Sequence, residues 1–460
     1  MNLLESWHFF SYDLGSLNVD EYLECDVKPV RLAILGLGTV GGGALKLLKE
    51  NAAEIKRRTG REIEITHVGT RRPRPDLDLP ASVKQSSDLM DIVRQPDVDV
   101  VVEVMGGIHP AYEVIQEAIK HGKQVVTANK ALLAEYGNEL FKLADDHHVQ
   151  IAYEAAVAGG IPIIKVMREG LAANKIDWLA GIINGTGNFI LTEMREKGRA
   201  FADVLKEAQE LGYAEADPTF DVEGIDAAHK LTLLASIAFG IPLQFDKVFT
   251  EGISKITAQD VKYAEDLGFR IKHLGIARRA ETGIELRVHP TLIPEDQLIA
   301  NVNGVKNAVL VQANAVGPTL YYGAGAGAGP TASAVVADVV DIVRDISYTE
   351  DGAGTIPQLA FEALTDLPIL PREEMTTGYY IRINAEDQTG VLADVTTILS
   401  RAGISIDAIM QQPRLKDLIP IVILTDPVKE SKMDEALQQI QALPVIHGEI
   451  VRIRLESLDN

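Results

Sequence analysis

The regular hydrophobic pattern of the chain opens near residue 28. A short apolar run over residues 31–35 ends in glycine, as a buried strand does. A helical pattern follows over residues 39–58, and Gly60 is a stop signal. Further strand-like runs cover residues 62–68, 99–105 and 124–127. Strands that alternate with helices predict a parallel sheet with helices on both faces.

The pattern changes beyond about residue 151. Helical periodicity dominates from residue 162 to residue 240, and strand-like runs such as 283–288 come after it. A Gly/Ala run over residues 321–330 ends in proline and precedes a predicted helix over residues 331–344. This middle region therefore predicts an α+β domain.

The last part of the chain predicts a compact unit behind a linker. Residues 347–371 are rich in Gly, Pro and acidic side chains, which is typical of a linker. The strands and helices that follow are expected over residues 379–384, 390–402, 404–410, 419–425, 431–442 and 451–455. This βαββαβ order predicts a ferredoxin-like unit.

These patterns predict an α/β protein of five segments. They are an acidic N-terminal extension (1–27), a Rossmann-type dinucleotide-binding domain (28–150, to which 330–346 return), an α+β catalytic and dimerisation domain (151–329), a linker (347–377) and a ferredoxin-like domain (378–455). The extension carries six acidic residues and no Lys or Arg, unlike a secretory signal. Whether it belongs to the native chain stays open at this stage.

Composition narrows the functional classes. The 460 residues carry 66 Asp and Glu against 44 Lys and Arg, a net charge of −22, which argues against a nucleic-acid binder. The single cysteine, Cys25, excludes an intramolecular disulfide and a Cys-rich zinc site. It fits a reducing compartment, so we expect a cytoplasmic protein. The longest uncharged apolar stretch, residues 231–245, is shorter than the roughly 20 residues of a membrane span.

A glycine motif follows the first strand. Residues 36–41 read G-x-G-x-x-G between a predicted strand and a predicted helix. Gly36 would allow the tight turn, Gly38 would let a pyrophosphate approach, and Gly41 would let helix and strand pack closely. A packing turn without ligand is the alternative, but the strand-turn-helix context favours a dinucleotide.

Basic side chains follow two of the strands. The second strand ends at residues 69–74 without an acid, and Arg71 and Arg72 suit a 2′-phosphate, which favours NADP(H) over NAD(H). A solvated loop is the alternative. Lys130 follows the strand over residues 124–127, on the side of the sheet where ligands bind.

The window over residues 211–230 is rich in acids. Asp226 and Lys230 are four residues apart on a predicted helix, so they share a face. The carboxylate could orient the lysine, and the lysine could donate a proton to a carbonyl oxygen. Glu215 and Asp221 could bind a substrate ammonium. On spacing alone, an ordinary surface ion pair is the favoured interpretation.

The chain from residue 28 onward resembles a monofunctional homoserine dehydrogenase with a C-terminal ACT domain. The matching segments are residues 35–43, 127–133, 154–162, 184–191, 215–230 and 329–334. The resemblance implies a reversible, NAD(P)-dependent interconversion of L-homoserine and L-aspartate 4-semialdehyde, in threonine, methionine and isoleucine biosynthesis. No aspartate-kinase region precedes the glycine motif, unlike in the bifunctional form.

The resemblance also implies site residues. Lys230 would be the proton donor, Asp226 would orient it, and Lys130 would reach the cofactor and the reacting oxygen. The implied cofactor-binding set is Gly36, Gly38, Thr39, Val40, Gly41, Arg71, Arg72 and Lys130. The implied substrate-binding set is Glu215, Asp221, Gly185 and Lys230. Gly187 departs from the family, which more often has threonine there.

A cation site and a regulatory site are implied as well. The carbonyls of Glu154, Val157, Gly159 and Ile161 would hold a monovalent cation, Na⁺ or K⁺, with a Gly-rich hinge as the alternative. Residues 387–393 and 402–406 resemble the ACT signature, which implies feedback control with L-threonine as effector and a homodimer or homotetramer. A dimerisation domain without ligand is the alternative.

Two other classes remain at this stage. One is a different dehydrogenase of amino-acid or sugar metabolism, against which residues 184–191 and 215–230 argue. The other is a catalytically silent sensor, which would bind an amino acid without oxidising NADPH.

Overall fold

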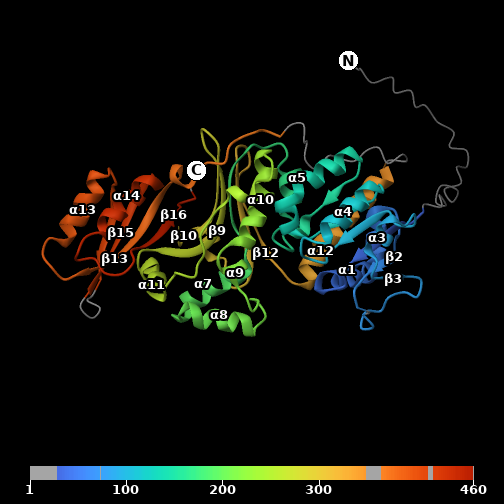
Figure 1. Cartoon of the computed structure of the whole chain (residues 1–460), viewed down its shortest axis with the longest axis horizontal. Coiled ribbons are helices and arrows are strands. Elements are labelled where there is room, and N and C mark those ends of the chain that lie inside the picture. The colour runs from blue at the N-terminus through green and yellow to red at the C-terminus, as the bar shows by residue number, and fades with distance from the viewer. Residues whose placement is uncertain (1–27, 73, 349–363, 413–417, 459–460) are drawn as a thin grey trace, which may run out of the picture.

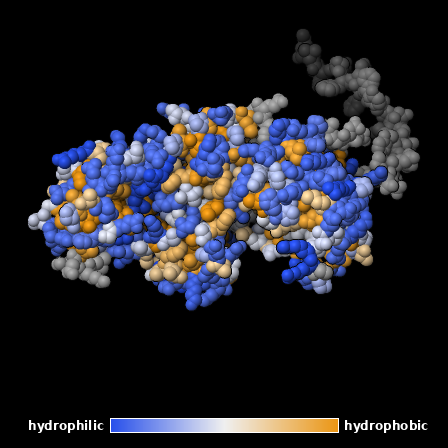
Figure 2. Space-filling model, in the orientation of Figure 1, coloured by the Kyte–Doolittle hydropathy of each residue, from blue (hydrophilic) through white to orange (hydrophobic). Residues whose placement is uncertain are grey.

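The computed structural model describes residues 28–72, 74–348, 364–412 and 418–458. Three lobes follow one another along the long axis of the molecule (Figure 1). The expected N-terminal extension and residues 349–363 of the expected linker lie outside the described residues. The face in Figure 2 is mostly hydrophilic, and its hydrophobic residues gather in separate patches. No helix in the described ranges is long and apolar enough to cross a membrane.

The first lobe holds a six-stranded parallel sheet in the order β3-β2-β1-β4-β5-β6. Its strands are β1 (Val30–Leu35), β2 (Ile63–Gly69), β3 (Lys84–Ser86), β4 (Val100–Glu103), β5 (Gln124–Thr127) and β6 (Ile151–Ala152). The strand order reverses between β1 and β4. Such a switch point opens a crevice at the carboxyl ends of the strands, where dinucleotides bind.

Helices cover both faces of this sheet. They are α1 (Thr39–Glu50), α2 (Ala52–Thr59), α3 (Leu89–Arg94), α4 (Ala111–Lys120), α5 (Lys130–Asp146) and α12 (Ala328–Tyr348). The expected single helix over residues 39–58 is wrong, because Asn51 leaves helical geometry and separates α1 from α2. Helix α12, from far along the chain, packs on α1 among the blue elements (Figure 1). It begins three residues before the expected start, with Pro330 in its first turn.

The middle lobe packs helices on a sheet whose pairs are antiparallel, except that β8 runs parallel to β10. Its strands are β7 (Ile176–Ile182), β8 (Phe249–Thr250), β9 (Phe269–Arg279), β10 (Ile284–Pro294), β11 (Lys306–Ala313) and β12 (Gly317–Ala324). Its helices are α6 (Ile163–Lys165), α7 (Gly185–Lys197), α8 (Phe201–Glu210), α9 (Thr219–Val222), α10 (Ile225–Phe239) and α11 (Ala258–Asp266). Short helical turns are η2 (Glu154–Ala156), η3 (Val166–Gly170), η4 (Phe245–Lys247) and η5 (Leu298–Asn301).

Strand β7 corrects the expectation that helices dominate residues 162–240. Six of its seven residues are buried. A strand that is buried on both faces shows no alternation of polar and apolar residues, so its sequence resembles that of a buried helix.

The last lobe has the predicted ferredoxin-like order. Its elements are η7 (Arg372–Glu374), β13 (Thr376–Glu386), α13 (Val391–Arg401), β14 (Ile406–Gln411), β15 (Leu418–Lys429), α14 (Glu430–Gln441) and β16 (Val451–Leu455). The strands pair antiparallel in the order β16-β13-β15-β14. The predicted α/β fold class, with a Rossmann-type domain, an α+β middle domain and a ferredoxin-like domain, is therefore confirmed.

The last lobe is joined to the middle lobe through the sheet. Strand β16 pairs with β10 in parallel, at Thr291 opposite Arg454 and Leu292 opposite Leu455. The two sheets thus become one ten-stranded sheet, β12-β11-β7-β9-β10-β16-β13-β15-β14, with β8 added beside β10. Part of the expected linker also packs on β10, because Leu370 donates to the Ile284 carbonyl at 2.8 Å.

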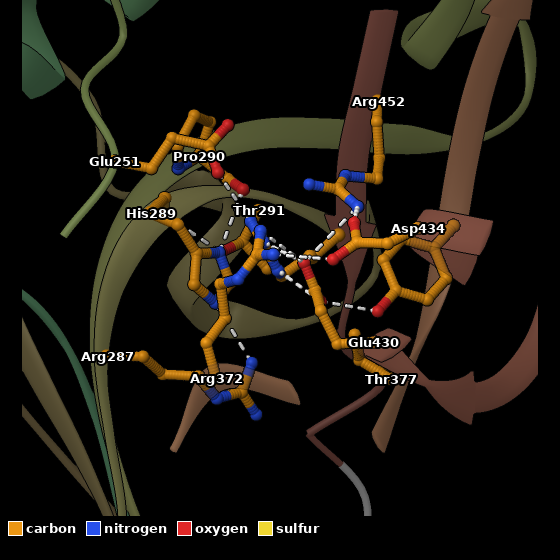
Figure 3. Close-up of polar contacts among 12 residues, drawn as sticks. Glu251, Arg287, His289, Pro290, Thr291, Arg372, Thr377, Glu430, Asp434 and Arg452 are labelled. Atoms are coloured by element: carbon orange, nitrogen blue, oxygen red, sulfur yellow. Dashed lines mark hydrogen bonds and ion pairs between the residues drawn. The ribbon is translucent and has the colours of Figure 1, made fainter. Parts of the chain in front are cut away.

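Buried ion pairs follow this junction, which we call the β10–β16 seam. Arg287 is fully buried and donates to Glu456 Oε1 at 2.6 Å. Arg454 donates to Glu430 Oε2 at 3.0 Å and to Glu251 Oε2 at 2.7 Å, so it joins the two lobes. Figure 3 shows the charged side chains of both lobes converging at the seam. Burial and the two neighbouring arginines lower the pKa of His289 well below its usual value, so its neutral ring faces Arg287.

Candidate active site

A crevice of about 640 Å³ opens at the carboxyl ends of β1 and β4. Of the expected cofactor-binding residues, those that line it are Gly36, Gly38, Arg71 and Arg72. Thr39, Val40 and Gly41 form the first turn of α1 behind it. The crevice lies at the switch point of the sheet, so its position and its glycine turn fit a dinucleotide.

The glycine turn has the geometry that a close ligand requires. Gly36 has a φ of 100°, and a Cβ there would lie 2.9 Å from the Val104 carbonyl oxygen. A Cβ on Gly41 would lie 1.9 Å from the Gly36 carbonyl oxygen, so only glycine lets α1 approach β1 this closely. Gly38 faces open space, which leaves its backbone accessible to a pyrophosphate.

The arginines behind β2 differ in their partners. Arg74 pairs with Asp76 at 2.7 Å and also donates to the Leu37 carbonyl. Arg71 and Arg72 are exposed, and neither forms an ion pair with a carboxylate among the residues that the structure describes. Their guanidinium groups are therefore available to a ligand phosphate.

Asp226 joins two lysines from different lobes. Its Oδ2 accepts from Lys230 Nζ at 2.7 Å, and its Oδ1 lies 3.2 Å from Lys130 Nζ. Lys230 Nζ also donates to the Ile183 carbonyl at 2.7 Å. The side chains of Asp226 and Lys230 are only 11% and 12% exposed. The interpretation of this spacing as a surface ion pair is therefore wrong. Both side chains lie on the face of α10 that is buried at the boundary between the first two lobes.

The helix cap before α5 fixes Lys130. Asn129 Oδ1 accepts from the Leu132 N–H at 3.3 Å, and Asn129 Nδ2 donates to the Gly107 carbonyl at 2.6 Å. Lys130 is the first residue of α5, so this cap sets where its side chain begins. Its Nζ reaches to 3.2 Å from Asp226 Oδ1.

Asn184 was missed by the sequence analysis as a site residue. Its Nδ2 donates to Asp221 Oδ1 at 2.8 Å and to Asp226 Oδ2 at 2.9 Å. Its Oδ1 accepts from the Gly187 N–H at 2.7 Å, which caps α7 and holds the amide in this orientation. The signal available in the sequence was an Asn directly before a helix, a typical N-cap. Gly185, the next residue, packs closely, since a Cβ there would lie 2.8 Å from the Val305 carbonyl oxygen.

The charges of the cluster follow from these contacts. Burial alone would raise the pKa of Asp226, but the charges of Lys230 and Lys130 outweigh it and hold that pKa below its usual value. Burial lowers the pKa of Lys230, Lys130 lowers it further, and Asp226 opposes both. Burial raises the pKa of Asp221. The cluster therefore pairs a fixed carboxylate with an ammonium that releases its proton more readily than a free lysine.

Glu215 and His229 differ in their surroundings. Glu215 is exposed on the loop between α8 and α9, and no contact joins its carboxylate to Lys230 or Asp226 among the described residues. Its backbone carbonyl accepts from Gln209 Nε2 at 3.1 Å. His229 is buried between the rings of Phe220 and Phe245, and burial lowers its pKa to about 4.

The turn that was expected to hold a cation lies after β6. Ala158 and Gly159 both have a φ of 54°, and no N–H of the described residues donates to the carbonyls of Val157 or Gly159. The carbonyls of Glu154 and Ile161 accept from backbone N–H groups at 3.3 and 2.8 Å. Of the four expected carbonyls, those of Val157 and Gly159 are therefore the two without a backbone donor among the described residues. In the described ranges, no group of three or more His, Cys, Asp and Glu side chains could hold a metal.

Comparison with known families covers most of the chain. Residues 36–154 match the homoserine dehydrogenase NAD-binding domain, residues 162–340 match homoserine dehydrogenase, and residues 379–445 match the ACT domain. The homoserine dehydrogenase of Pseudomonas aeruginosa is 60% identical over 437 residues, which are 94% of this chain and 100% of that protein.

Solved structures agree with these matches. The crystal structure of a homoserine dehydrogenase from Thiobacillus denitrificans is 58% identical, with a TM-score of 0.90 over 94% of this chain and 99% of that one. A hyperthermophilic archaeal homoserine dehydrogenase in complex with NADPH is 27% identical, with a TM-score of 0.59 over 68% of this chain and 97% of that one. The chain belongs to the homoserine dehydrogenases, a family of oxidoreductases, and carries their NAD-binding, catalytic and ACT domains.

Proposed function

We propose that the chain interconverts L-homoserine and L-aspartate 4-semialdehyde with NADP(H) as the preferred cofactor. The observation that carries the proposal is the Asp226 carboxylate between Lys230 of the middle lobe and Lys130 of the first lobe. The nicotinamide, when bound, supplies or accepts the hydride. Consumption of NADPH with L-aspartate 4-semialdehyde tests the proposal. Equal turnover of other amino-acid aldehydes, or none of this one, would overturn it.

The chain's own residues handle the proton. In the reductive direction, Lys230 Nζ donates its proton to the aldehyde oxygen as negative charge develops there. Asp226 and the Ile183 carbonyl hold the ammonium in place. Lys130 adds a second positive charge near the same oxygen. In the oxidative direction, neutral Lys230 takes the proton of the homoserine hydroxyl.

Asp221 supports substrate binding in this proposal. Asp221 Oδ1 accepts a hydrogen bond from Asn184 Nδ2 at 2.8 Å. The remaining lone pairs of the carboxylate can accept hydrogen bonds from the substrate ammonium. Glu215 would join it from the exposed loop. Gly185 would contribute through its backbone at the start of α7, since its side-chain position is filled by the Val305 carbonyl.

The cofactor preference predicts a change in two arginine variants. Replacing Arg71 and Arg72 by Ala should raise the KM for NADPH about 10- to 100-fold, the loss expected for charge-assisted hydrogen bonds to a phosphate. The KM for NADH should change little, because NADH lacks the 2′-phosphate. Arg58→Ala, an exposed arginine of α2, is the matched control. An equal effect on both cofactors would contradict the preference.

We predict that Asn184 positions Asp221 and Asp226, and that this role can be tested separately from its capping of α7. Asn184→Ser keeps a capping hydroxyl but loses the amide that bridges Asp221 and Asp226. We expect kcat/KM to fall about 10- to 100-fold, since two carboxylates lose a donor, while the melting temperature stays near that of the wild type. An Asn184→Ser enzyme with wild-type activity would show that Asn184 acts only as a cap.

The pH dependence of reduction depends on Lys230. Lys230 must carry its proton to act as the donor in reduction. Because its pKa is lowered, the rate of reduction should start to fall, as the pH rises, at a pH below the ordinary lysine pKa of 10.5. Lys130→Met removes a positive charge that lowers this pKa, so the alkaline limb should move to higher pH. Lys142→Met, on the exposed face of the same helix, should leave the limb in place. Rate profiles of the three enzymes measure the shift.

Other features are proposed on the resemblance to the family. They are the domain boundaries given above, a monovalent cation at the carbonyls of residues 154–161, L-threonine as an effector, a homodimer or homotetramer, and a cytoplasmic location. The two free carbonyls at Val157 and Gly159 support the cation. The glycine turn before α13, where Gly390 has a φ of 99°, supports the effector site. The structure of an archaeal relative with NADPH supports the cofactor preference.

A further inference from the structure

A buried carboxylate behind the dinucleotide crevice takes no part in the steps above. Glu103 is the last residue of β4 and is fully buried. The residues that follow it, 104–106, line the crevice. Glu103 Oε1 accepts from the Met105 N–H at 2.8 Å, so the carboxylate lies directly behind the crevice wall.

The contacts of Glu103 indicate that it is ionised. Its Oε1 accepts from Met105, and its Oε2 accepts from the Thr127 hydroxyl at 2.7 Å. Thr127 Oγ1 itself accepts from the Asn129 N–H at 3.0 Å, so the hydroxyl directs its own proton at Glu103. Both oxygens of Glu103 thus face donors, which is the arrangement of a carboxylate and not of a protonated acid.

The charge of Glu103 is not balanced by a cation of the described residues. Within those ranges no Lys, Arg or His forms an ion pair with it, unlike the buried Asp226 with its two lysines. Burial raises the pKa of Glu103, and hydrogen bonds from the Thr127 side chain and from backbone N–H groups oppose this rise. A buried charge without a counter-charge is costly. A ligand that brings positive charge to the crevice would therefore stabilise this carboxylate.

The order of the strands indicates which half of a dinucleotide lies over Glu103. The glycine turn after β1 suits the pyrophosphate, and Arg71 and Arg72 behind β2 mark the side of the adenosine half. We therefore expect the nicotinamide half on the other side, over the ends of β4 and β5. Gly106 has a φ of 73°, and a Cβ there would meet nothing within 4 Å. The backbone of the turn after β4 is thus open to that half.

The two oxidation states of the cofactor differ in charge at this place. The nicotinamide ring of NADPH is neutral, whereas that of NADP⁺ carries a positive charge. During reduction the ring therefore gains positive charge while the substrate oxygen gains negative charge. Lys230 and Lys130 are the positive groups assigned above to the oxygen. Glu103 supplies a negative charge on the side of the ring.

We propose that the Glu103 carboxylate stabilises the oxidised nicotinamide ring, whose positive charge it attracts through the crevice wall. Glu103 acts through its charge and touches neither the substrate nor the cofactor. It should therefore tighten the binding of NADP⁺ relative to that of NADPH. The inference rests on the proposed function, which names NADP(H) as the cofactor.

Calorimetric titration of the full chain with NADP⁺ and with NADPH, in the absence of substrate, tests the inference. Glu103→Gln removes the charge, and its amide can still accept from Met105 and donate to Thr127. We expect the Kd for NADP⁺ to rise about tenfold, the scale for unit charges roughly 10 Å apart inside a protein, while the Kd for NADPH changes little. An unchanged Kd for NADP⁺, or an equal rise for both forms, would overturn the inference.

Thr127→Val separates the charge from the hydrogen bond. It removes the hydroxyl but keeps the carboxylate, so the ratio of the two Kd values should stay near that of the wild type. Glu64→Gln removes an acid from the exposed side of β2, opposite Arg31 near the start of β1, and should change neither Kd. A ratio that shifts in Thr127→Val as far as in Glu103→Gln would also overturn the inference.

A double variant keeps the test valid if Glu103→Gln does not fold. Glu103→Leu combined with Thr127→Val removes the charge and leaves no Thr127 donor unpaired, a replacement of both partners that costs little stability. It should show the same selective rise of the Kd for NADP⁺. A wild-type ratio in the double variant would contradict the role of the charge.

The inference and the proposed function fail in different ways. Binding is measured by heat and does not depend on turnover, so a chain that shows the Glu103 effect without reducing L-aspartate 4-semialdehyde contradicts only the proposed function. An active chain whose ratio is the same in the wild type and in both charge-removing variants contradicts only the role of Glu103. If NADH binds more tightly than NADPH, the ratio for NAD⁺ and NADH decides the inference in the same way.

Discussion

Replacing Lys230 by Ala is expected to lower kcat in both directions about 10²- to 10⁴-fold, the range for loss of a general acid or base. Lys230 Nζ is the buried donor nearest to Asp226, and its lowered pKa suits proton transfer. The dinucleotide crevice does not include Lys230 among its lining residues, so the affinity for NADPH should stay the same. Steady-state rates and NADPH titration by fluorescence measure the two quantities.

Two comparisons make this result specific to proton transfer. Exogenous methylamine should restore part of the activity of Lys230→Ala, since a small amine can occupy the space of the lost side chain. Lys206→Ala, an exposed lysine of α8 beside Glu210, should keep full activity. Wild-type turnover in Lys230→Ala, or a loss of NADPH binding equal to the loss of rate, would contradict the assigned role.

Replacing Arg287 by Met is expected to lower the free energy of unfolding of the last two lobes by about 3–5 kcal/mol, the cost of breaking a buried ion pair. Arg287 is fully buried and contacts Glu456 at 2.6 Å and Glu285 at 3.1 Å. Without the guanidinium, two buried carboxylates lose their counter-charge. Urea denaturation followed by circular dichroism measures the change.

Arg278 provides a matched control on the same carboxylate. It contacts Glu456 Oε2 at 3.0 Å, but its side chain is 27% exposed, so water replaces part of the lost interaction. Arg278→Met should therefore cost much less than Arg287→Met. If both variants lose the same free energy of unfolding, burial at the seam does not determine how much an ion pair with Glu456 contributes to stability.

Much of the fold could be predicted, because local patterns decide it. The turn at Gly36, the run of β4 and the βαββαβ order of the last lobe all follow from short-range periodicity and glycine placement. Strand β7 could not be predicted in this way, since burial on both faces removes the alternation that identifies a strand. The break at Asn51 shows the same limit, because a single polar residue ended a helix whose apolar stripe continued.

The residues of the site could be predicted from the sequence, but most of the contacts between them could not. The i,i+4 spacing placed Asp226 and Lys230 on one face, yet spacing alone favoured a solvated pair. Their burial depends on the boundary between two lobes, and Lys130 reaches Asp226 from about 100 residues earlier in the chain. Asn184 was visible as a helix cap, but its second role requires that α7 and α10 begin side by side. Contacts between residues so far apart in the sequence are set by tertiary packing, and no short sequence pattern indicates them.

The junction of the ACT domain had no signal in the sequence either. Only two residue pairs join β10 to β16. The arginines and glutamates that surround them are scattered between Glu251 and Glu456, so their pairing appears only in the folded chain. A linker followed by an independent unit was therefore the natural expectation.

A crystal structure of the full chain with L-homoserine and NADP⁺ tests the central claim most directly. The account predicts that the homoserine hydroxyl lies within about 3 Å of Lys230 Nζ, the distance of a productive hydrogen bond, and that the substrate ammonium faces Asp221. A hydroxyl placed away from both Lys230 and Lys130, with another group at hydrogen-bond distance, would contradict it.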